Sequence, residues 1–437
     1  MDKKKKSCVY LQGSLYLAPN EIRTCCQRFF FKGKFKGDVP LITLDKPRDI
    51  SFQEITEAKK TLIERINNGK DQQCTGCPEL KYDFWPDVED EQVHGISIEN
   101  HSVCNMRCTY CSDMYYGGLK PQYDPDYLFK DLNEVSDDLH IAWGGGEPSV
   151  GKDFEPLFKK LYQRFKPKTQ RIFTNALKYS PAIQHGLDNR ITSITTSIDA
   201  GTEDTFRLIR KAKRLDKVLS NLKLYSSLNP DLVTIKYIMT DENYGLSELE
   251  SFVEIIIKYN LKKCDFLIST DYKEEQPAVD KFLSLMVLYY LLYKEGIFAV
   301  TLDDHVFKRI MKTDLKSLAS SNNKILPDRY KGIVQEMGNF IDYHIKREII
   351  VWGTGEFSKF LFRASKILNK MNIIKIIDGN QNKWGKVFKG YNIEHPDVVK
   401  NSDASIVIAS VNYYGEIANQ IIAMGVSAKR IVPNIIL

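Results

Sequence analysis

The stretch that decides the fold is residues 94–111, His-Gly-Ile-Ser-Ile-Glu-Asn-His-Ser-Val-Cys-Asn-Met-Arg-Cys-Thr-Tyr-Cys. Residues 95–99 have the pattern of a short strand. The turn that follows holds Cys104, Cys108 and Cys111, spaced by three residues and then two. A compact loop with this spacing can point three thiolates at one metal centre. A closed structural zinc site has four protein ligands, whereas three thiolates on a [4Fe–4S] cluster leave one iron open for a substrate. Zinc, or a chance clustering of cysteines, is the alternative.

The nine cysteines are concentrated, because eight of them precede residue 112. No signal-peptide pattern or membrane-length apolar run is evident, so we expect a cytoplasmic protein without a membrane span. In a reducing compartment, clustered cysteines are more often metal ligands than disulfides. The net charge of +6 is spread along the chain, apart from a basic run at residues 2–6. We interpret this run as a solvated N-terminus. Because no basic face or stripe is evident, we expect no nucleic-acid partner.

The chain of 437 residues is long enough for several domains. Four segments are predicted: 1–93, 94–275, 276–345 and 346–437. In the second, short apolar strands alternate with amphipathic helices, which predicts an α/β fold with a parallel sheet, a partial (β/α)6 TIM-type barrel. The third segment is predicted to be mainly helical. The predicted barrel strands are 95–99, 139–143, 171–174, 191–198, 232–239 and 265–269, and the predicted helices include 126–135, 154–165 and 246–259.

The three-cysteine loop after a first strand resembles the signature of radical S-adenosylmethionine (SAM) enzymes, and the resemblance covers residues 94–275. In that family an aromatic residue before the last cysteine lies against the adenine, which implies this role for Tyr110. A glycine-rich turn after the second strand meets the SAM amino group, and Gly144-Gly145-Gly146-Glu147 stands in that place. Glycines let backbone groups approach a ligand closely.

The same resemblance implies SAM contacts at the ends of later strands, for Asn175, Ser197 and Asp199, and on the next helix for Arg210, which can pair with a carboxylate bidentately. Ordinary loop residues or helix caps are the alternative for each. The implied cofactors are a [4Fe–4S] cluster and SAM, and the implied partner is a one-electron reductant such as flavodoxin or ferredoxin. The implied chemistry is hydrogen abstraction by a 5′-deoxyadenosyl radical.

The N-terminal segment holds five more cysteines, and its pattern predicts strands at 10–17 and 20–24, a helix at 52–68 and a loop at 71–81. The segment resembles half of a SPASM-type auxiliary-cluster domain, although such domains usually follow the barrel. The resemblance implies a second [4Fe–4S] cluster, and zinc is the alternative. The implied ligands are Cys8, Cys74, Cys77 and one of Cys25 and Cys26.

Cys264 stands apart from the other cysteines, before the sixth predicted strand. In a radical epimerase a thiol can return a hydrogen atom to the substrate radical. An inert buried cysteine is the favoured interpretation.

The last segment, 346–437, predicts a small doubly wound, Rossmann-like domain with strands at 349–352, 373–377 and 405–409. Gly353 and Gly355 follow the first of these strands, and Asp378 ends the next, 23 residues beyond Gly355. This resembles a dinucleotide-binding fingerprint in which Ser358 replaces the third glycine. The segment is more similar to the sugar-nucleotide-binding domains of polysaccharide-biosynthesis enzymes. A docking domain without a ligand is the alternative.

These features favour a radical SAM enzyme that acts on a sugar, a sugar nucleotide or a sugar-linked molecule by epimerisation, dehydrogenation or rearrangement. Modification of a peptide or protein is the second hypothesis, because auxiliary clusters are frequent in peptide-modifying relatives. A non-enzymatic, metal-stabilised binding protein is the third.

Overall fold

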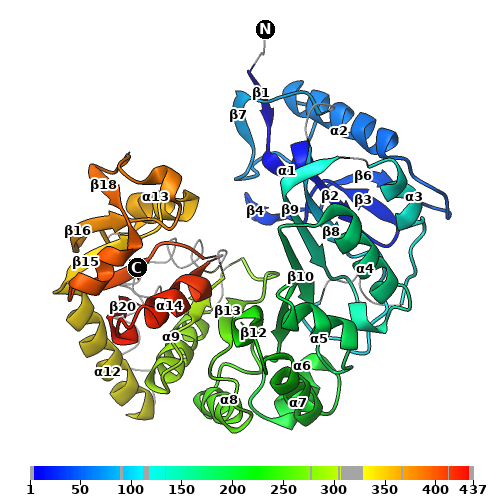
Figure 1. Cartoon of the computed structure of the whole chain (residues 1–437). Helices are drawn as coiled ribbons and strands as arrows, with labels where there is room; N and C mark the ends of the chain where they lie inside the picture. The colour runs from blue at the N-terminus through cyan, green and yellow to red at the C-terminus, as the bar shows by residue number, and fades with distance from the viewer. Residues whose placement is uncertain are drawn as a thin grey trace. The chain divides into compact units, whose positions relative to one another are not determined.

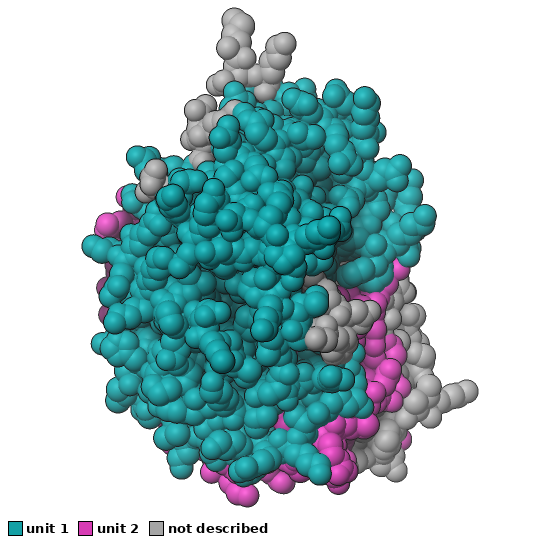
Figure 2. Space-filling model, turned by 90° about the vertical axis from the view of Figure 1, so that its right-hand side faces the viewer, with its two compact units in different colours: residues 1–196, 210–228 teal, residues 197–209, 229–437 magenta. Residues whose placement is uncertain are grey.

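The computed structural model describes residues 4–88, 92–111, 118–132, 134–275, 278–303, 306, 328–365, 368–411 and 413–432. The chain divides into two compact units, which Figure 2 colours separately: residues 1–196 with 210–228, and residues 197–209 with 229–437. Among the described helices, none has the length and apolar character that crossing a membrane requires.

The first unit is built around seven neighbouring strands of one sheet (Figure 1), in the order β6-β3-β2-β8-β9-β10-β11. The strands from β2 to β11 in this order are parallel, and β3 and β6 continue the edge in antiparallel fashion. Their bounds are β2 (Ser14–Leu17), β3 (Glu21–Arg23), β6 (Pro40–Thr43), β8 (Val93–Ile98), β9 (Val135–Trp143), β10 (Thr169–Phe173) and β11 (Ser193–Ser197).

Strands from the N-terminal segment extend the sheet that carries the cysteine loop, since β2 pairs in parallel with β8. The predicted strand at 10–17 is confirmed for residues 14–17, which form β2, and is wrong for residues 10–13, which belong to the helix α1 (Val9–Gly13). The reason is local: the Cys8 side chain caps this helix by accepting a hydrogen bond from the backbone N–H of Leu11. The predicted helix at 52–68 is confirmed as α2 (Phe52–Asn67), which begins with a capping box between Ser51 and Glu54.

Two small antiparallel ribbons complete the N-terminal segment, and four helices accompany the later strands. The predicted helix at 126–135 is too long, because Val135 already belongs to β9 and pairs with Val93. The ribbons are β1 (Lys4–Ser7) with β7 (Lys81–Phe84) and β4 (Arg28–Phe31) with β5 (Lys34–Gly37), and the helices are α3 (Pro125–Lys130), α4 (Phe154–Phe165), α5 (Pro181–Asp188) and α7 (Leu215–Tyr225).

The second unit holds three further parallel strands in the order β12-β13-β14. The described part of the segment 276–345, predicted to be mainly helical, holds two long helices and the short strand β14. A strand of three residues is too short to show a period in the sequence. The elements are α6 (Glu203–Arg210, whose last residue is counted with the first unit), β12 (Val233–Met239), α8 (Leu246–Lys258), β13 (Asp265–Thr270), α9 (Val279–Lys294), β14 (Val300–Leu302) and α12 (Asp328–Ile345).

The C-terminal part of this unit is a separate six-stranded sheet in the order β17-β18-β16-β15-β19-β20, parallel except for β17 (Figure 1, orange and red). The three strands predicted for this segment are confirmed. Apolar side chains form two clusters on this sheet, in which Trp352 and Val351 are buried. The elements are β15 (Glu348–Trp352), α13 (Glu356–Ala364), β16 (Asn372–Ile377), β17 (Val387–Phe388), β18 (Tyr391–Glu394), β19 (Ser405–Ile408), α14 (Tyr414–Ala423) and β20 (Ile431–Val432).

Candidate active site

The three-cysteine loop follows the carboxyl end of β8, as the sequence predicts. Its backbone is folded tightly: the Cys111 N–H donates to the carbonyl oxygen of Cys108 at 3.1 Å. The Met106 N–H donates to the Cys104 Sγ at 3.4 Å. Such N–H donation to sulfur is common around iron–sulfur ligands, where it helps to set the reduction potential. Cys108 is buried, and Cys104 and Cys111 are half-buried.

The glycine turn 144–146 at the end of β9 packs directly on the cysteine loop. The Gly146 N–H donates to the His101 carbonyl oxygen, and the Glu147 N–H donates to the Val103 carbonyl oxygen, each at 2.8 Å. A Cβ atom at Gly146 would lie 2.1 Å from the carbonyl oxygen of Val103. Only glycine fits this approach, so the two predicted motifs meet backbone to backbone.

The Glu147 carboxylate is buried and joins the ends of two strands. It accepts hydrogen bonds from the Ser149 hydroxyl at 2.6 Å, the Thr174 hydroxyl at 2.8 Å and the Asn175 N–H at 2.6 Å. Burial raises the pKa of Glu147, and these hydrogen bonds oppose that rise. These contacts to the ends of β9 and β10 give Glu147 a positioning role.

Asn175 reaches from the end of β10 to the cysteine loop. Its Nδ2 donates to the Asn105 Oδ1 at 2.6 Å and lies 3.7 Å from the Cys104 Sγ. The structure therefore brings this predicted SAM residue beside the first of the three cysteines.

Arg210 and Tyr110 form a pair that the sequence did not predict, although both residues were candidates. The Arg210 guanidinium donates to the Tyr110 hydroxyl and lies 5.6 Å from the centroid of its ring. The Arg210 carbonyl oxygen accepts from the Arg107 N–H at 3.2 Å. Burial raises the pKa of the Cys104 thiol, and the positive charge of Arg210 opposes that shift. A guanidinium beside the loop is placed to favour thiolates there.

Ser197 and Asp199 lie in the second unit, at the end of β11 and just after it. Asp199 is buried, has a left-handed backbone (φ 59°) and accepts a hydrogen bond from the Ile238 N–H at 2.7 Å. Burial raises the pKa of Asp199 to about 8. This carboxyl group therefore joins its loop to β12.

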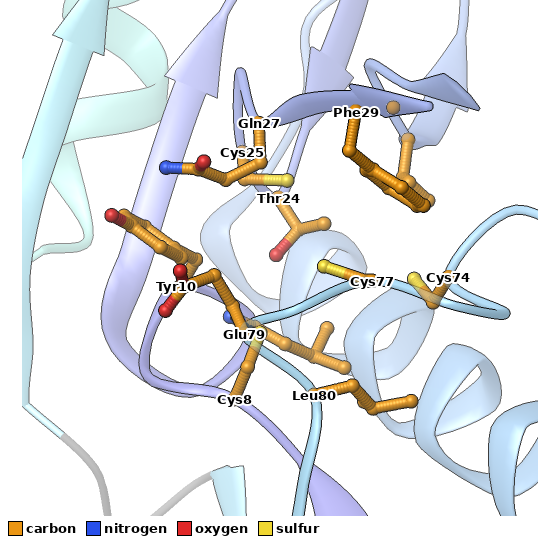
Figure 3. Close-up of a pocket in the computed structure, with 13 residues that line it drawn as sticks. Cys8, Tyr10, Thr24, Cys25, Gln27, Phe29, Cys74, Cys77, Glu79 and Leu80 are labelled. Atoms are coloured by element: carbon orange, nitrogen blue, oxygen red, sulfur yellow. Dashed lines mark hydrogen bonds between the residues drawn. The ribbon is translucent and has the colours of Figure 1, made fainter. Parts of the chain in front are cut away.

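The N-terminal cysteines gather at one pocket of the first unit, shown in Figure 3. Cys8, Cys25, Cys74 and Cys77 line it, together with Thr24. Cys26 is not among the lining residues. Burial raises the pKa of Cys25 to about 12 and the pKa of Cys8 above its usual range. The neighbouring thiols add to both shifts, because each thiolate disfavours the next.

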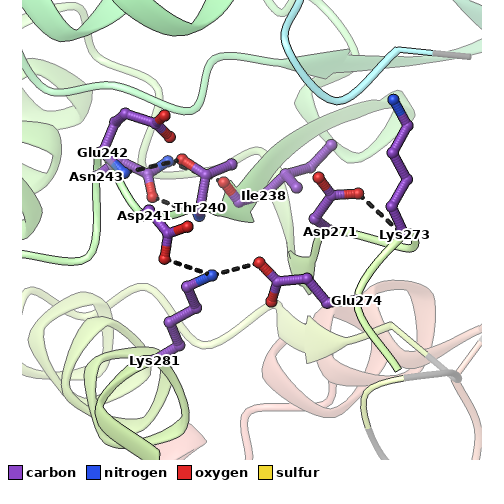
Figure 4. A network of polar contacts seen from close by, with 9 residues as sticks. All are labelled: Ile238, Thr240, Asp241, Glu242, Asn243, Asp271, Lys273, Glu274 and Lys281. Atoms are coloured by element: carbon purple, nitrogen blue, oxygen red, sulfur yellow. Dashed lines mark hydrogen bonds and ion pairs between the residues drawn. The ribbon is translucent and has the colours of Figure 1, made fainter. Parts of the chain in front are cut away.

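A buried lysine lies at the carboxyl ends of β12 and β13, as Figure 4 shows. Lys281 is only 3% exposed, and its Nζ lies 2.9 Å from the Asp241 Oδ1 and within hydrogen-bond distance of Glu274. Sequence reasoning missed this group. Its three residues come from the two loops and α9, and no motif links them.

Cys264 is 1% exposed and precedes β13 at its amino end, where its N–H donates to the Leu261 carbonyl oxygen at 3.0 Å. Its burial and its place at the start of the strand favour the interpretation as an inert core residue.

The C-terminal sheet brings Asp378 to the turn after β15, where its carboxylate contacts protein groups. Its Oδ2 accepts from the Thr354 N–H at 3.0 Å and from the Thr354 hydroxyl at 2.5 Å. Lys383 contacts the same oxygen at 3.0 Å. These contacts lower the pKa of Asp378 despite its burial. The carboxylate therefore holds the turn that carries Gly353 and Gly355.

Among the described residues, no three His, Cys, Asp or Glu side chains already lie close enough together to hold a metal ion. The donor set and the close backbone packing nevertheless fit a three-thiolate cluster at the loop 104–111.

Two family models match the chain. The Radical SAM superfamily model matches residues 101–254, and the model for the N-terminal domain of C2185-like proteins matches residues 345–432. Residues 101–254 therefore form a radical SAM domain. The cofactors of that superfamily are a [4Fe–4S] cluster and SAM.

Curated relatives include GTP 3′,8-cyclases. The protein from Clostridium botulinum (strain Okra / Type B1) is 21% identical over 179 residues, which are 40% of this chain and 56% of that protein. The protein from Pasteurella multocida (strain Pm70) is 29% identical over 149 residues, 31% of this chain and 42% of that protein. The chain thus spans about half the length of the curated relatives it matches.

Similar solved structures include native anSMEcpe with bound AdoMet and the Cp18Cys peptide, at a TM-score of 0.38 and 17% identity, covering 48% of this chain and 62% of that one. Streptococcus suis SuiB bound to the precursor peptide SuiA matches at a TM-score of 0.37 and 14% identity, covering 57% of this chain and 62% of that one.

Proposed function

We propose that this chain, whose residues 101–254 form a radical SAM domain, is an enzyme that cleaves SAM reductively and removes a hydrogen atom from its substrate. The observation that carries the proposal is the backbone contact between the cysteine loop and the glycine turn at Gly146. When bound, the cluster supplies one electron to the sulfonium of SAM, whose S–C5′ bond breaks to give methionine and a 5′-deoxyadenosyl radical. An external flavodoxin or ferredoxin provides the electron.

The residues of the first unit have distinct roles in this proposal. Cys104, Cys108 and Cys111 hold the cluster, and the turn 144–146 offers backbone groups to the SAM amino group. Tyr110 and Arg210 bind the adenosyl or carboxylate part. Glu147 and Asn175 hold the ends of β9 and β10 in register with the loop.

The test is anaerobic incubation of the reconstituted chain with SAM and dithionite. We expect methionine and 5′-deoxyadenosine in equal amounts, and neither product from a variant with alanine at Cys104, Cys108 and Cys111. No cleavage by the wild-type chain, or equal cleavage by the variant, would refute the proposal and favour a metal-stabilised binding protein.

The substrate that we favour is a sugar or a sugar nucleotide, and the C-terminal sheet supports this choice. Counted along the chain without the short β17, its parallel strands lie in the order third, second, first, fourth, fifth. Doubly wound nucleotide-binding sheets have this order, and their ligands lie where the order reverses. Here that point lies between β15 and β19, beside the turn with Gly353 and Gly355.

Binding to the full chain tests this assignment, with nucleoside diphosphate sugars, NAD and GTP as probes. A Cβ atom at Gly355 would meet nothing within 4 Å, so Gly355→Glu introduces a negative charge at the start of α13 without a clash. We expect it to abolish binding of a phosphate-bearing ligand. Gly245→Glu, at another open position, is the control and leaves binding intact. No binding of any probe would favour a docking domain.

Peptide or protein modification is the second candidate, supported by the pocket of four cysteines. Turnover with sugar and peptide candidates in deuterated solvent separates the two. Deuterium from the solvent that appears in a candidate identifies that candidate as the substrate. Deuterium that passes from a labelled candidate into 5′-deoxyadenosine identifies it in the same way, as a sugar or as a peptide.

A further inference from the structure

Three separate segments of the first unit contribute cysteines to one pocket. Cys8 precedes α1, Cys25 follows β3, and Cys74 and Cys77 lie in the loop between α2 and β7. These positions are as many as 69 residues apart in the chain, so only tertiary folding brings them together. Four thiol side chains around one space match the four-thiolate sets of iron–sulfur clusters and of structural zinc.

The loop with Cys74 and Cys77 is held in place by hydrogen bonds within the protein. The Cys74 N–H donates to the Asp71 Oδ2 at 2.7 Å, and the Cys77 N–H donates to the Cys74 carbonyl oxygen at 3.0 Å. Lys36 donates to the carbonyl oxygens of Gln72 and Thr75. Between the two cysteines, Gly76 has a φ of 83°, a conformation that favours glycine. Both side chains are therefore presented on one side of a fixed turn.

The adjacent residues Cys25 and Cys26 differ in their surroundings. Cys25 lines the pocket with the other three cysteines, and Cys26 does not. Cys26 is instead exposed, whereas Cys25 is half-buried. The geometry thus selects one residue of a pair that the sequence left open.

Thr24 adds a hydroxyl group to the same pocket. The residue is only 2% exposed, and its Oγ1 has no hydrogen-bond partner among the described residues. Figure 3 shows its side chain between those of Cys25 and Cys77. A buried hydroxyl without a partner costs free energy. Because the Thr24 hydroxyl lies in a pocket lined by thiols, we expect it to find a hydrogen-bond acceptor in that pocket.

We propose that Cys8, Cys25, Cys74 and Cys77 ligate an iron–sulfur cluster separate from the one at Cys104–Cys111, and that the Thr24 hydroxyl donates a hydrogen bond to one of its sulfur atoms. The four cysteines surround a pocket, as a cluster of several iron and sulfide ions requires. A single zinc ion would instead need the four sulfur atoms to converge on one metal position. The acceptor that Thr24 lacks is supplied by a sulfide or a thiolate. Hydrogen bonds to cluster sulfurs raise the reduction potential, so Thr24 tunes this cluster.

Metal analysis after anaerobic reconstitution tests the ligand set, in a background with alanine at Cys104, Cys108 and Cys111. We expect about four irons per chain with matching sulfide in that background, as a four-cysteine [4Fe–4S] site predicts. Adding Cys25→Ala removes most of this iron, whereas the matched change Cys26→Ala leaves it in place. Zinc without sulfide, or iron lost with Cys26→Ala and kept with Cys25→Ala, would overturn the assignment. Because this background cannot cleave SAM by the proposed route, the result is independent of the proposed function.

Thr24→Val tests the hydroxyl, because valine has nearly the same shape. We expect an unchanged iron content and a more negative midpoint potential in an EPR-monitored redox titration. Thr61→Val, at an exposed position of α2, is the control and leaves the potential unchanged. Equal potentials for Thr24→Val and wild type would overturn the role of Thr24. The intact iron content of Thr24→Val and Cys26→Ala also shows whether the segment 24–26 still folds.

Discussion

The Glu147 carboxylate accepts a hydrogen bond from the backbone N–H of Asn175 at 2.6 Å, and this bond links the end of β9 to the end of β10. Both strands carry predicted SAM residues where they end. A buried acceptor with several donors is costly to alter, because each donor is then left without a partner. Glu147 is therefore expected to control the geometry of the SAM site.

The first prediction concerns Glu147→Gln. The amide NH2 group faces a fixed backbone donor, the N–H of either Asn175 or Ser149, so at least one hydrogen bond is lost. We expect a loss of about 1–3 kcal/mol in unfolding free energy and weaker SAM binding. Urea unfolding and SAM titration measure the two effects. The control is Glu254→Gln, at an exposed position of α8, which should match wild type in unfolding free energy and in SAM affinity. Wild-type values for Glu147→Gln would show that its carboxylate has no positioning role.

A methyl group at Gly146 should displace the cysteine loop, since it would lie 2.1 Å from the Val103 carbonyl oxygen. We expect Gly146→Ala to lower the iron bound at Cys104–Cys111 and to reduce SAM cleavage on the order of a hundredfold, the cost that a 1 Å misplacement can have. Iron analysis and 5′-deoxyadenosine yield measure this. Gly245→Ala meets no neighbour within 4 Å and serves as the control. Normal iron and normal cleavage in Gly146→Ala would contradict the close packing.

Arg210→Lys keeps the positive charge but removes the planar group that contacts Tyr110. We expect the dissociation constant of SAM to rise about tenfold while the iron content stays unchanged, as for the loss of one bidentate or stacked contact. Equilibrium titration of the reconstituted chain with SAM provides the measurement. A loss of iron without a change in SAM affinity would assign Arg210 to the loop and not to the ligand.

Lys281 should stabilise the second unit, because it is 3% exposed and lies between Asp241 and Glu274. Replacing it with methionine leaves two carboxylates facing each other. We expect a loss of about 1–3 kcal/mol, less than for a fully buried pair because Asp241 is largely exposed. Lys294→Met, which breaks an exposed pair with Glu336, should cost about 0.5 kcal/mol or less. Denaturant unfolding of the full chain compares the two variants, and equal losses would contradict the prediction.

His344 should make the C-terminal domain sensitive to acid. It is buried, its Nδ1 lies 3.1 Å from the Ser405 hydroxyl, and burial lowers its pKa to about 4. Unfolded histidine titrates near pH 6.5, so the unfolded chain binds more protons between about pH 4 and 6.5. The stabilisation is therefore complete above about pH 6.5 and is lost as the pH falls towards 4.

Between pH 7.5 and 5.5 we expect His344 to account for a loss on the order of 1 kcal/mol. Thermal unfolding of the full chain at the two pH values measures it. His344→Gln should reduce this acid sensitivity, and His395→Gln, at an exposed residue, should not. Identical pH dependence in all three proteins would show that His344 does not titrate as described.

Much of the fold follows from local patterns. The strands predicted at 95–99, 171–174, 232–239 and 265–269 appear as β8, β10, β12 and β13 within two residues at each end. The errors have local causes. A side-chain cap at Cys8 makes residues 9–13 helical, and Val135 belongs to a strand although its spacing also fits a helix. The pairing of β2 with β8 joins residues about 80 apart, and no short pattern records such a contact.

For the site, the sequence by itself determined the spacing of the three cysteines in the loop 104–111. Ligand spacing within a few residues is a local property, and so is the glycine turn at 144–146. Only the tertiary structure decided which of two adjacent cysteines lines the N-terminal pocket, that Arg210 contacts Tyr110, and that Asp378 holds Thr354. Side-chain direction and partners distant in the chain are set by packing, so two adjacent residues with the same chemistry, Cys25 and Cys26, have different surroundings.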